Sequence, residues 1–177
     1  ESAVCNLASI NLSKINTKED IERVVPIAIR MLDNVIDLNF YPTRKVRTTN
    51  LKNRAIGLGV MGIAEMLAKE QIMWGSNEHL HKIDKIMELI SFNAINASSD
   101  IAKEKGVYPD YKGSNWSKGI FPIDVANNEA LSLVDRDLFD RCDWDSLRQK
   151  VITQGIRNGY LMAIAPTSSI SILVGTT

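Results

Sequence analysis

Apolar residues recur at intervals of three and four along the early part of the chain, which is the spacing of one face of an amphipathic helix. Thr17 and Asp20 precede this run and match a capping box, so the helix is expected to begin there. Pro26 lies inside the run and should kink the helix, because proline lacks the N–H that a helix interior requires. Tyr41-Pro42 is expected to end the element.

Two further stretches show the same helical spacing. The longer one begins at Ser76 or Asn77, residue types that cap helices well, and continues until Gly106. The other follows Asp143, a second favourable cap, and ends at Gly155. Both patterns predict helices with one apolar face turned toward a core.

Short apolar runs lie outside these helices. Residues 4–12 alternate loosely and predict a strand or an extended turn, and residues 160–165 predict a buried strand. Residues 55–61 form an apolar run that glycines interrupt and that leads into a further helix with Ile63, Met66 and Leu67. Residues 43–54 are polar and basic, and we expect a loop there, either a solvated connection or a rim that faces an anion. Helices that alternate with buried strands are typical of the α/β class. Because ligands of such folds gather where strands end, the loop at residues 166–169 is the first candidate site.

The length and net charge of the chain exclude several classes of protein. The chain has 177 residues, enough for one domain with a core, so residues 1–177 are interpreted as a single unit. Lys and Arg together number 21, as do Asp and Glu, and this zero net charge argues against a nucleic-acid partner. No apolar stretch approaches the roughly 18 residues of a membrane span. The first residues lack a signal-peptide pattern, so a cytoplasmic location is expected.

Gly57, Gly59 and Gly62 match the G-x-G-x-x-G spacing of dinucleotide-binding folds, which makes an NAD-dependent dehydrogenase one alternative. The match lacks a full hydrophobic strand before the first glycine and an acidic residue at the end of a second strand. Glycines that let a strand and a helix pack closely explain the motif more simply. A non-catalytic helical module that binds a partner through its apolar stripes is another alternative.

The cysteine and histidine residues form no recognisable metal-binding pattern. Cys5 and Cys142 stand far apart, at a spacing that fits neither a zinc site nor a disulfide framework. His79 and His81 are two positions apart on a predicted helix, so they point in different directions and cannot share one metal ion.

Hydroxyl side chains concentrate in residues 167–171, directly after the last predicted strand. Amide groups in such a turn can bind a phosphate, because their dipoles converge on the anion. A turn rich in serine and threonine can equally satisfy its own main chain. The residue types alone leave both interpretations open.

Several separate motifs together resemble the catalytic large subunit of ribonucleotide reductase. They occur in the same order as in that family, and they extend over nearly the whole chain. They are residues 3–12 (AVCNLASINL), 39–42 (NFYP), 54–60 (RAIGLGV), 102–106 (AKEKG), 118–124 (KGIFPID), 155–158 (GIRN) and 165–171 (APTSSIS).

The resemblance implies that residues 1–177 form an internal portion of a ten-stranded α/β barrel within a longer chain. It also implies that Cys5 is one of two redox cysteines that deliver electrons to the ribose and form a disulfide in each turnover. Such a thiol can meet a second thiol on a neighbouring strand and be reduced again by exchange. The second cysteine is expected upstream of this segment, so Cys142 is interpreted as incidental.

In the same family, the segment that corresponds to Thr167, Ser168, Ser169 and Ile170 binds the diphosphate of the substrate through main-chain N–H groups. Ile170 stands where some relatives carry a hydroxyl, a change that costs little if the amide makes the contact. The consecutive serines resemble class I enzymes more than the cobalamin-dependent class II enzymes.

The resemblance also implies the partners of the complete enzyme. They are a ribonucleoside diphosphate substrate, a small radical-generating metal subunit, nucleotide effectors and a dithiol reductant of the thioredoxin or glutaredoxin type. The full-length subunit is expected to form a homo-oligomer. The segment itself is expected to hold no metal or cofactor. It is expected to be inactive alone, because the radical cysteine and relay tyrosines of the family belong to other parts of the longer chain.

Overall fold

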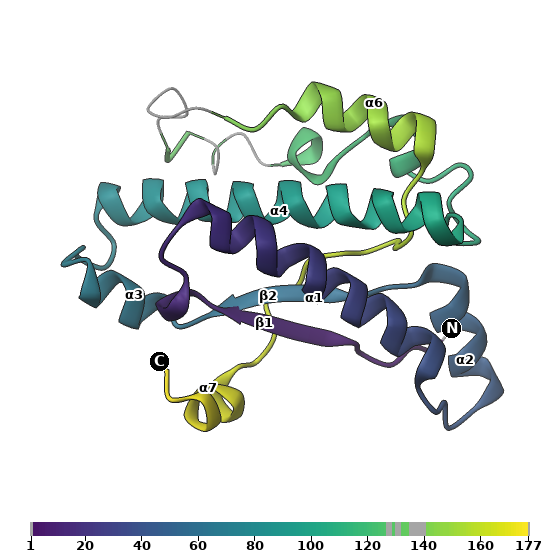
Figure 1. The fold of residues 1–177 in the computed structure, drawn as a ribbon, viewed down its shortest axis with the longest axis horizontal. Helices are drawn as coiled ribbons and strands as arrows, with labels where there is room; N and C mark the ends of the chain where they lie inside the picture. Colours follow the sequence, from purple (N-terminus) through teal and green to yellow (C-terminus); the bar gives the residue numbers. More distant parts are fainter. Residues whose placement is uncertain (1, 127–128, 130–131, 135–140, 177) are drawn as a thin grey trace.

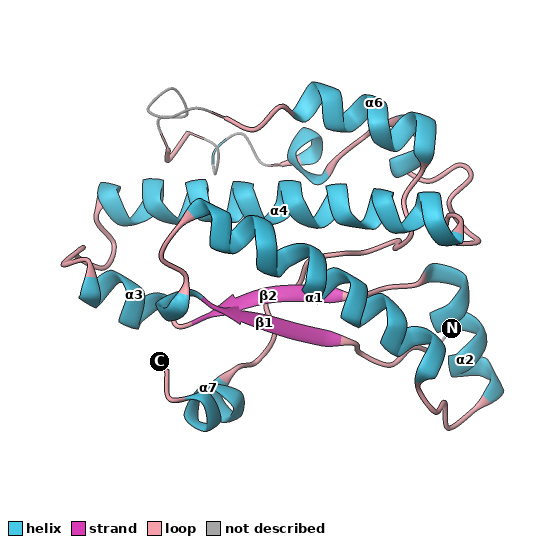
Figure 2. Ribbon diagram, in the orientation of Figure 1, coloured by secondary structure: helices cyan, strands magenta, loops and turns pink. Residues whose placement is uncertain are grey.

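Two short parallel strands with long helices on one side form the centre of the molecule. The computed structural model describes residues 2–126, 129, 132–134 and 141–176. Strand β1 (Leu7–Asn11) pairs in parallel with β2 (Gly57–Met61), so that the first residues of the two strands lie opposite each other. Helices α1 (Lys18–Leu38) and α4 (Asn77–Lys105) lie on one side of this sheet, and α7 (Ser168–Val174) lies on the other (Figures 1 and 2). The predicted α/β class is confirmed.

Helix α1 begins and ends where its sequence predicts. The Thr17 hydroxyl accepts a hydrogen bond from the Asp20 N–H, and the Asp20 carboxylate accepts one from the Thr17 N–H, each at 3.3 Å. This reciprocal pairing is the predicted capping box. The helix contains Pro26, ends at Leu38 and buries a stripe of aliphatic side chains that includes Val25.

The predicted loop at residues 43–54 is wrong, because most of this segment forms α2 (Arg44–Asn53). The Thr43 hydroxyl caps the helix by accepting a hydrogen bond from the Val46 N–H at 3.3 Å. Only Val46 and Asn50 are buried on this helix, so a polar segment can form it without showing an apolar stripe. Arg54 ends it in the left-handed conformation, with φ of 45°.

The remaining predicted helices are confirmed. Helix α4 is capped by the Ser76 hydroxyl and ends at Gly106, where φ is +84°. Asp143 caps α6 (Trp144–Gln154), which packs on the side of α4 that faces away from the sheet (Figure 1). The shorter helical elements are η1 (Leu12–Lys14), α3 (Ile63–Lys69), η2 (Trp116–Lys118) and η3 (Pro122–Val125).

The hydrophobic core lies between the sheet and the helices. Leu58 and Val60 of β2 join Ile10 of β1 in a buried cluster with residues of α1 and α4, among them Ile29 and Ile90. Because successive side chains of a strand point to opposite faces, Leu7, Ser9, Asn11 and the glycines of β2 belong to the other face. We call this second face the open face of the sheet.

The predicted buried strand at residues 160–165 is only partly correct. Met162 forms a single parallel bridge with Leu58, whose N–H donates to the Leu161 carbonyl at 2.8 Å. Tyr160 and Ile164 are each 69% exposed, so most of this segment is not buried. Beyond the bridge the chain leaves the edge of β2 and crosses the open face, where Gly57 and Gly59 leave room for it.

A buried polar network fixes the ends of α1 and α2. The Arg54 guanidinium bonds Asp33 Oδ1 at 2.7 Å and Asp37 Oδ1 at 2.8 Å, and Asn158 Nδ2 donates to the same Asp33 oxygen at 3.0 Å. Asp33 is fully buried and Arg54 is 4% exposed. Removal of Arg54 would take the closest positive charge from the buried Asp33 carboxylate, at a cost of up to about 3–5 kcal/mol. Two of the motifs that carry the family resemblance, at residues 54–60 and 155–158, contain members of this network.

Among the described helices, none combines the length and the apolar character that a bilayer crossing requires.

Candidate active site on the open face of the sheet

Cys5 lies just before β1, with an exposed side chain and a free thiol. The next side chain, Asn6, donates a hydrogen bond from Nδ2 to the Leu32 carbonyl of α1 at 2.7 Å. The Gly57 N–H donates to the Asn6 carbonyl at 2.9 Å, so pairing with β2 continues to this residue. Because side chains alternate along an extended chain, Cys5 belongs to the open face, on the same side as Leu7.

A side chain of α2 holds the residue before the cysteine. Asn50 Oδ1 accepts a hydrogen bond from the Val4 N–H at 3.2 Å, and Asn50 Nδ2 donates one to the Val4 carbonyl at 3.1 Å. Asn50 is buried, and it lies on a helix that the sequence pattern did not predict.

The glycine motif of β2 allows close packing. A Cβ atom on Gly57 would lie 2.5 Å from Leu7 Cδ2 and 2.8 Å from Ala163 Cβ, and one on Gly59 would collide with the Ala163 carbonyl oxygen. Gly57 and Gly59 lie inside a strand, whereas a dinucleotide fingerprint places its glycines in the turn between strand and helix. The glycines allow close packing, but their neighbour is the extended segment at Ala163 and not the helix that the sequence pattern predicts. The geometry does not support the dinucleotide interpretation.

The predicted loop that contains Ser168, Ser169 and Ile170 is instead the first turn of α7, with Thr167 at the cap position. The first bond of this helix runs from the Ser171 N–H to the Thr167 carbonyl at 2.8 Å. The Thr167 side chain makes no capping bond. The three preceding amides, at residues 168–170, therefore have no acceptor in the helix itself. Thr167 is half-buried, and the other three predicted residues are exposed.

The far end of α7 is anchored at the carboxyl ends of the strands. Thr176, which is buried, donates from Oγ1 to Glu65 Oε2 of α3 at 2.6 Å, and its hydroxyl lies 3.2 Å from Ser13 Oγ. Lys69 bonds the other oxygen of Glu65 at 2.7 Å. These two partners, Lys69 first and Thr176 second, lower the pKa of Glu65 to about 2.

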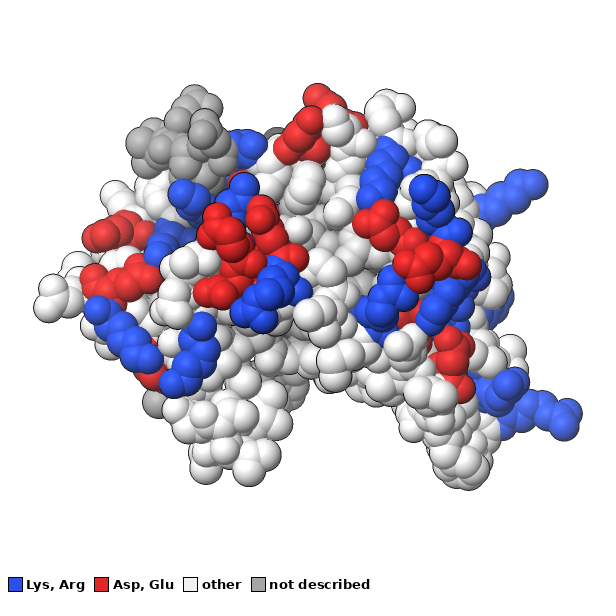
Figure 3. Space-filling model, in the orientation of Figure 1, with Lys and Arg blue, Asp and Glu red and all other residues white. Residues whose placement is uncertain are grey.

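Helix α7 lies on the side of the sheet that α1 and α4 leave free (Figure 1), and the alternation of side chains before β1 assigns Cys5 to the same side. Cys5 is at the amino end of β1, whereas the anchor of α7 is at the carboxyl ends of the strands. Figure 3 shows that the surface below the sheet is hollowed between the lobe of α7 and the lobe formed where α1 connects to α2. The main chain at Ala163 passes over the glycines between these two regions.

Cys142 lies elsewhere, between α4 and α6. Its N–H donates to Glu88 Oε1 at 3.1 Å, and its thiol is half-buried and free. Burial raises the pKa of the Cys142 thiol, and the negative charge of Glu88 raises it further. A raised pKa leaves less of the reactive thiolate at neutral pH.

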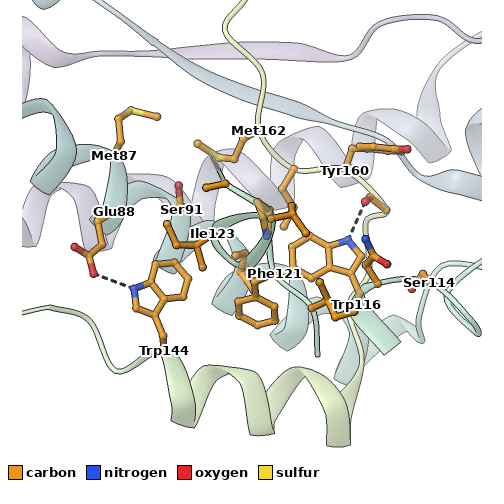
Figure 4. Close-up of a pocket in the computed structure, with 18 of the residues that line it drawn as sticks. Met87, Glu88, Ser91, Ser114, Trp116, Phe121, Ile123, Trp144, Tyr160 and Met162 are labelled. Carbon is orange, nitrogen blue, oxygen red and sulfur yellow. Dashed lines mark hydrogen bonds between the residues drawn. The ribbon is translucent and has the colours of Figure 1, made fainter. Parts of the chain in front are cut away.

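A cavity of about 820 Å³ lies between α4, α6 and the segments around residues 114–126 and 159–162 (Figure 4). Its walls are mainly apolar and include Trp116, Phe121 and Trp144. The Trp144 indole N–H donates to Glu88 Oε1, and the Trp116 indole N–H donates to the Gly159 carbonyl, each at 2.9 Å (Figure 4). None of the predicted site residues lines this cavity. Nothing in the sequence pattern predicted it, because its walls come from distant segments.

No group of three or more His, Cys, Asp or Glu residues within the described parts of the chain could hold a metal ion. His79 Nδ1 accepts the Gly75 N–H at 3.0 Å, and His81 Nδ1 lies 2.6 Å from the Asn77 carbonyl. The two imidazoles thus contact separate main-chain groups.

Comparison with known proteins supports the resemblance. The family model described as "Ribonucleotide reductase, barrel domain" matches residues 1–177. The chain is 72% identical to the ribonucleoside-diphosphate reductase subunit alpha of Helicobacter pylori over 178 aligned residues, which cover 100% of this chain and 23% of that protein. Identity is 46% to the subunit alpha of Chlamydia trachomatis, with 100% and 18% coverage. It is 36% to the large chain of Encephalitozoon cuniculi, with 99% and 22% coverage. The chain thus spans less than a quarter of the length of these relatives.

Proposed function

This chain belongs to the family of the ribonucleotide reductase barrel domain, and from that premise we propose that it supplies two parts of a reductase active site. Cys5 is the redox thiol, and residues 167–170 bind the diphosphate of a ribonucleoside diphosphate. The observation that carries the proposal is that α7 lies on the open face of the sheet, while the Asn6 side chain bonds α1 on the other face, so that alternation assigns its neighbour Cys5 to the face of α7.

The proposed reaction replaces the 2′ hydroxyl of the ribose by hydrogen. Cys5 and a second cysteine of the longer chain each give up one proton and one electron and form a disulfide. The two electrons and two protons replace the C–OH bond at C2′ by a C–H bond, and the hydroxyl leaves as water. A dithiol reductant then exchanges with the disulfide and restores both thiols. The exposed position of Cys5 at the start of β1 makes its sulfur accessible to each of these partners in turn.

The diphosphate is held at the first turn of α7. The amides of residues 168–170 have no acceptor within the helix, and hydrogen bonds from amides to an anion are stronger than those between neutral groups. Because the amides make the contact, Ile170 serves here as well as a hydroxyl residue does.

The family also supports proposals for the complete enzyme. It belongs to class I, acts in the cytoplasm as a homo-oligomer and binds nucleotide effectors. A small metal-containing subunit generates the radical that starts the reaction, and a reductant of the thioredoxin or glutaredoxin type regenerates the thiols.

The test uses the full-length subunit with its radical-generating subunit and a dithiol protein as reductant. Cys5→Ser should abolish multiple turnover of a ribonucleoside diphosphate, because serine cannot form the disulfide, while the dissociation constant of the substrate stays nearly unchanged. Cys142→Ser is the matched control and should keep wild-type turnover, since that thiol lies between α4 and α6. Normal multiple turnover in Cys5→Ser would contradict the proposed role.

A further inference from the structure

The main chain at the proposed redox cysteine is supported by one buried side chain. Asn50 bonds both the N–H and the carbonyl of Val4, at 3.2 and 3.1 Å, as a neighbouring strand would do. Asn50 is 6% exposed, so water has little access to the clamp. Leaving its amide group unpaired there would be unfavourable.

This clamp lies where the hydrogen bonds of the sheet end. The last bond from β2 toward the amino end of β1 goes to the Asn6 carbonyl. The main chain of residues 2–5 makes two hydrogen bonds to other described residues, and both are between Val4 and the Asn50 side chain. Cys5 therefore lies between two supports, the clamp on Val4 and the Asn6 side chain bonded to Leu32.

Helix α2 gives Asn50 a fixed position. Thr43 caps the start of the helix, and Arg54 follows its last residue, one turn after Asn50. The guanidinium of Arg54 is bonded to Asp33 and Asp37 of α1. Asn50 is thus carried by an element that is itself tied to the core, which is what a precise positioning group requires.

We propose that Asn50 is a positioning residue for Cys5, an inference that rests on the proposed function. By holding the Val4 main chain, Asn50 keeps the Cys5 sulfur at one place on the open face. The thiol can then meet both the ribose and the second cysteine. We expect no part for Asn50 in substrate binding, because the proposed diphosphate site is at α7, away from α2.

The test measures kcat and KM of Asn50→Ala in the full-length subunit with its radical-generating subunit. Misplacement of a reacting group by about 1 Å costs on the order of 100-fold in rate, so kcat should fall about 10- to 100-fold. KM for the diphosphate should stay within about twofold, because the binding contacts remain. Hydrogen exchange of the Val4 amide should become faster, since its acceptor is lost.

Asn53→Ala is the matched control. Asn53 lies on the same helix, and among the described residues its side chain donates to the Thr49 carbonyl within α2, at 3.3 Å. Kinetic constants and Val4 exchange should not change in this variant. Asn50→Asp, which keeps the size of the side chain and the acceptor for the Val4 N–H, should give an intermediate kcat and provides a second variant if Asn50→Ala does not fold.

A folded Asn50→Ala enzyme with kcat within about twofold of wild type would overturn the inference. A loss that raises KM as much as it lowers kcat would also overturn it. If Cys5→Ser keeps multiple turnover, the proposed function fails. If Cys5→Ser is inactive while Asn50→Ala is fully active, only the role of Asn50 fails.

Discussion

The amides of Ser168, Ser169 and Ile170 form the first turn of α7, where a helix leaves its N–H groups without internal acceptors. This arrangement makes side-chain identity secondary to main-chain geometry. The proposed anion site would therefore need few charged side chains near α7, since the helix end supplies partial positive charge.

Ser168→Pro removes one of these amides at the first helical position, where proline is well tolerated. In the full-length subunit, the affinity for a ribonucleoside diphosphate should fall by roughly 1–3 kcal/mol, about 5- to 150-fold in the dissociation constant. Ser168→Ala keeps the amide and serves as the control, with affinity unchanged. Equal dissociation constants for the proline and alanine variants would exclude an amide contact at this residue.

Glu65 gives the anchor of α7 a dependence on pH. Its pKa is about 2 in the folded protein and about 4.5 when unperturbed, so its contribution to stability is complete above pH 4.5. This contribution to stability is lost as the pH falls from 4.5 through about 2. The carboxylate is then protonated, and its interactions with Lys69 and Thr176, which favour the ionised form, are weakened.

Glu65→Gln should therefore weaken the anchor at neutral pH and have progressively less effect below pH 4.5. The Thr176 amide donates to the Ser171 carbonyl at 2.9 Å, so its hydrogen exchange measures how often the end of α7 opens. The measured rates are corrected for the pH dependence of exchange in an unfolded chain. Glu70→Gln, which removes an exposed ion pair with Lys82, should leave Thr176 exchange unchanged. If the difference in Thr176 exchange between wild type and Glu65→Gln stayed constant from pH 7 to pH 3, the proposed role of the Glu65 carboxylate would be wrong.

At the scale of elements, the path of residues 160–165 depends on the missing side chains of β2. Gly57 and Gly59 allow the main chain at Ala163 to cross the open face at a separation that no Cβ would permit. This crossing leads the chain from the sheet edge toward α7.

Gly57→Ala should destabilise the full-length subunit by about 1–3 kcal/mol, because the new Cβ would overpack against Leu7 Cδ2 and Ala163 Cβ. The double variant Gly57→Ala/Ala163→Gly should recover part of this loss, since it relieves one of the two contacts. Urea denaturation of the two single variants and the double variant gives their free energies of unfolding, and from these the interaction energy between positions 57 and 163. A Gly57→Ala variant as stable as wild type, or strictly additive effects, would show that the two residues are not in contact.

Local sequence patterns predicted the elements that have a periodic apolar face and a cap. α1, α4 and α6 all satisfy both conditions. Helix α2 does not, because it needs to bury only Val46 and Asn50, and its remaining polar residues look like those of a loop. The run at residues 160–165 is apolar enough for a buried strand, but its neighbours in space decide that it pairs only at Met162.

At the scale of the whole molecule, the candidate site combines residues from both ends of the chain. The family resemblance indicated Cys5 and residues 167–170 as site residues, but their supports could not be predicted. Asn50 is 46 residues from Val4, and Glu65 is 111 residues from Thr176, so only the folded structure brings these pairs together. The site therefore depends on α2 and α3, two elements that contribute no proposed reacting group.

The most direct test of the central claim follows the sulfur of Cys5 through one turnover. The fully reduced subunit, together with its radical-generating subunit, is given a ribonucleoside diphosphate without external reductant. It is then quenched in acid, alkylated and mapped by mass spectrometry. The account predicts that Cys5 is alkylated before turnover and lies in a disulfide afterwards, in proportion to the deoxy product formed, while Cys142 is alkylated in both samples. Product formation with Cys5 still free as a thiol would contradict the account.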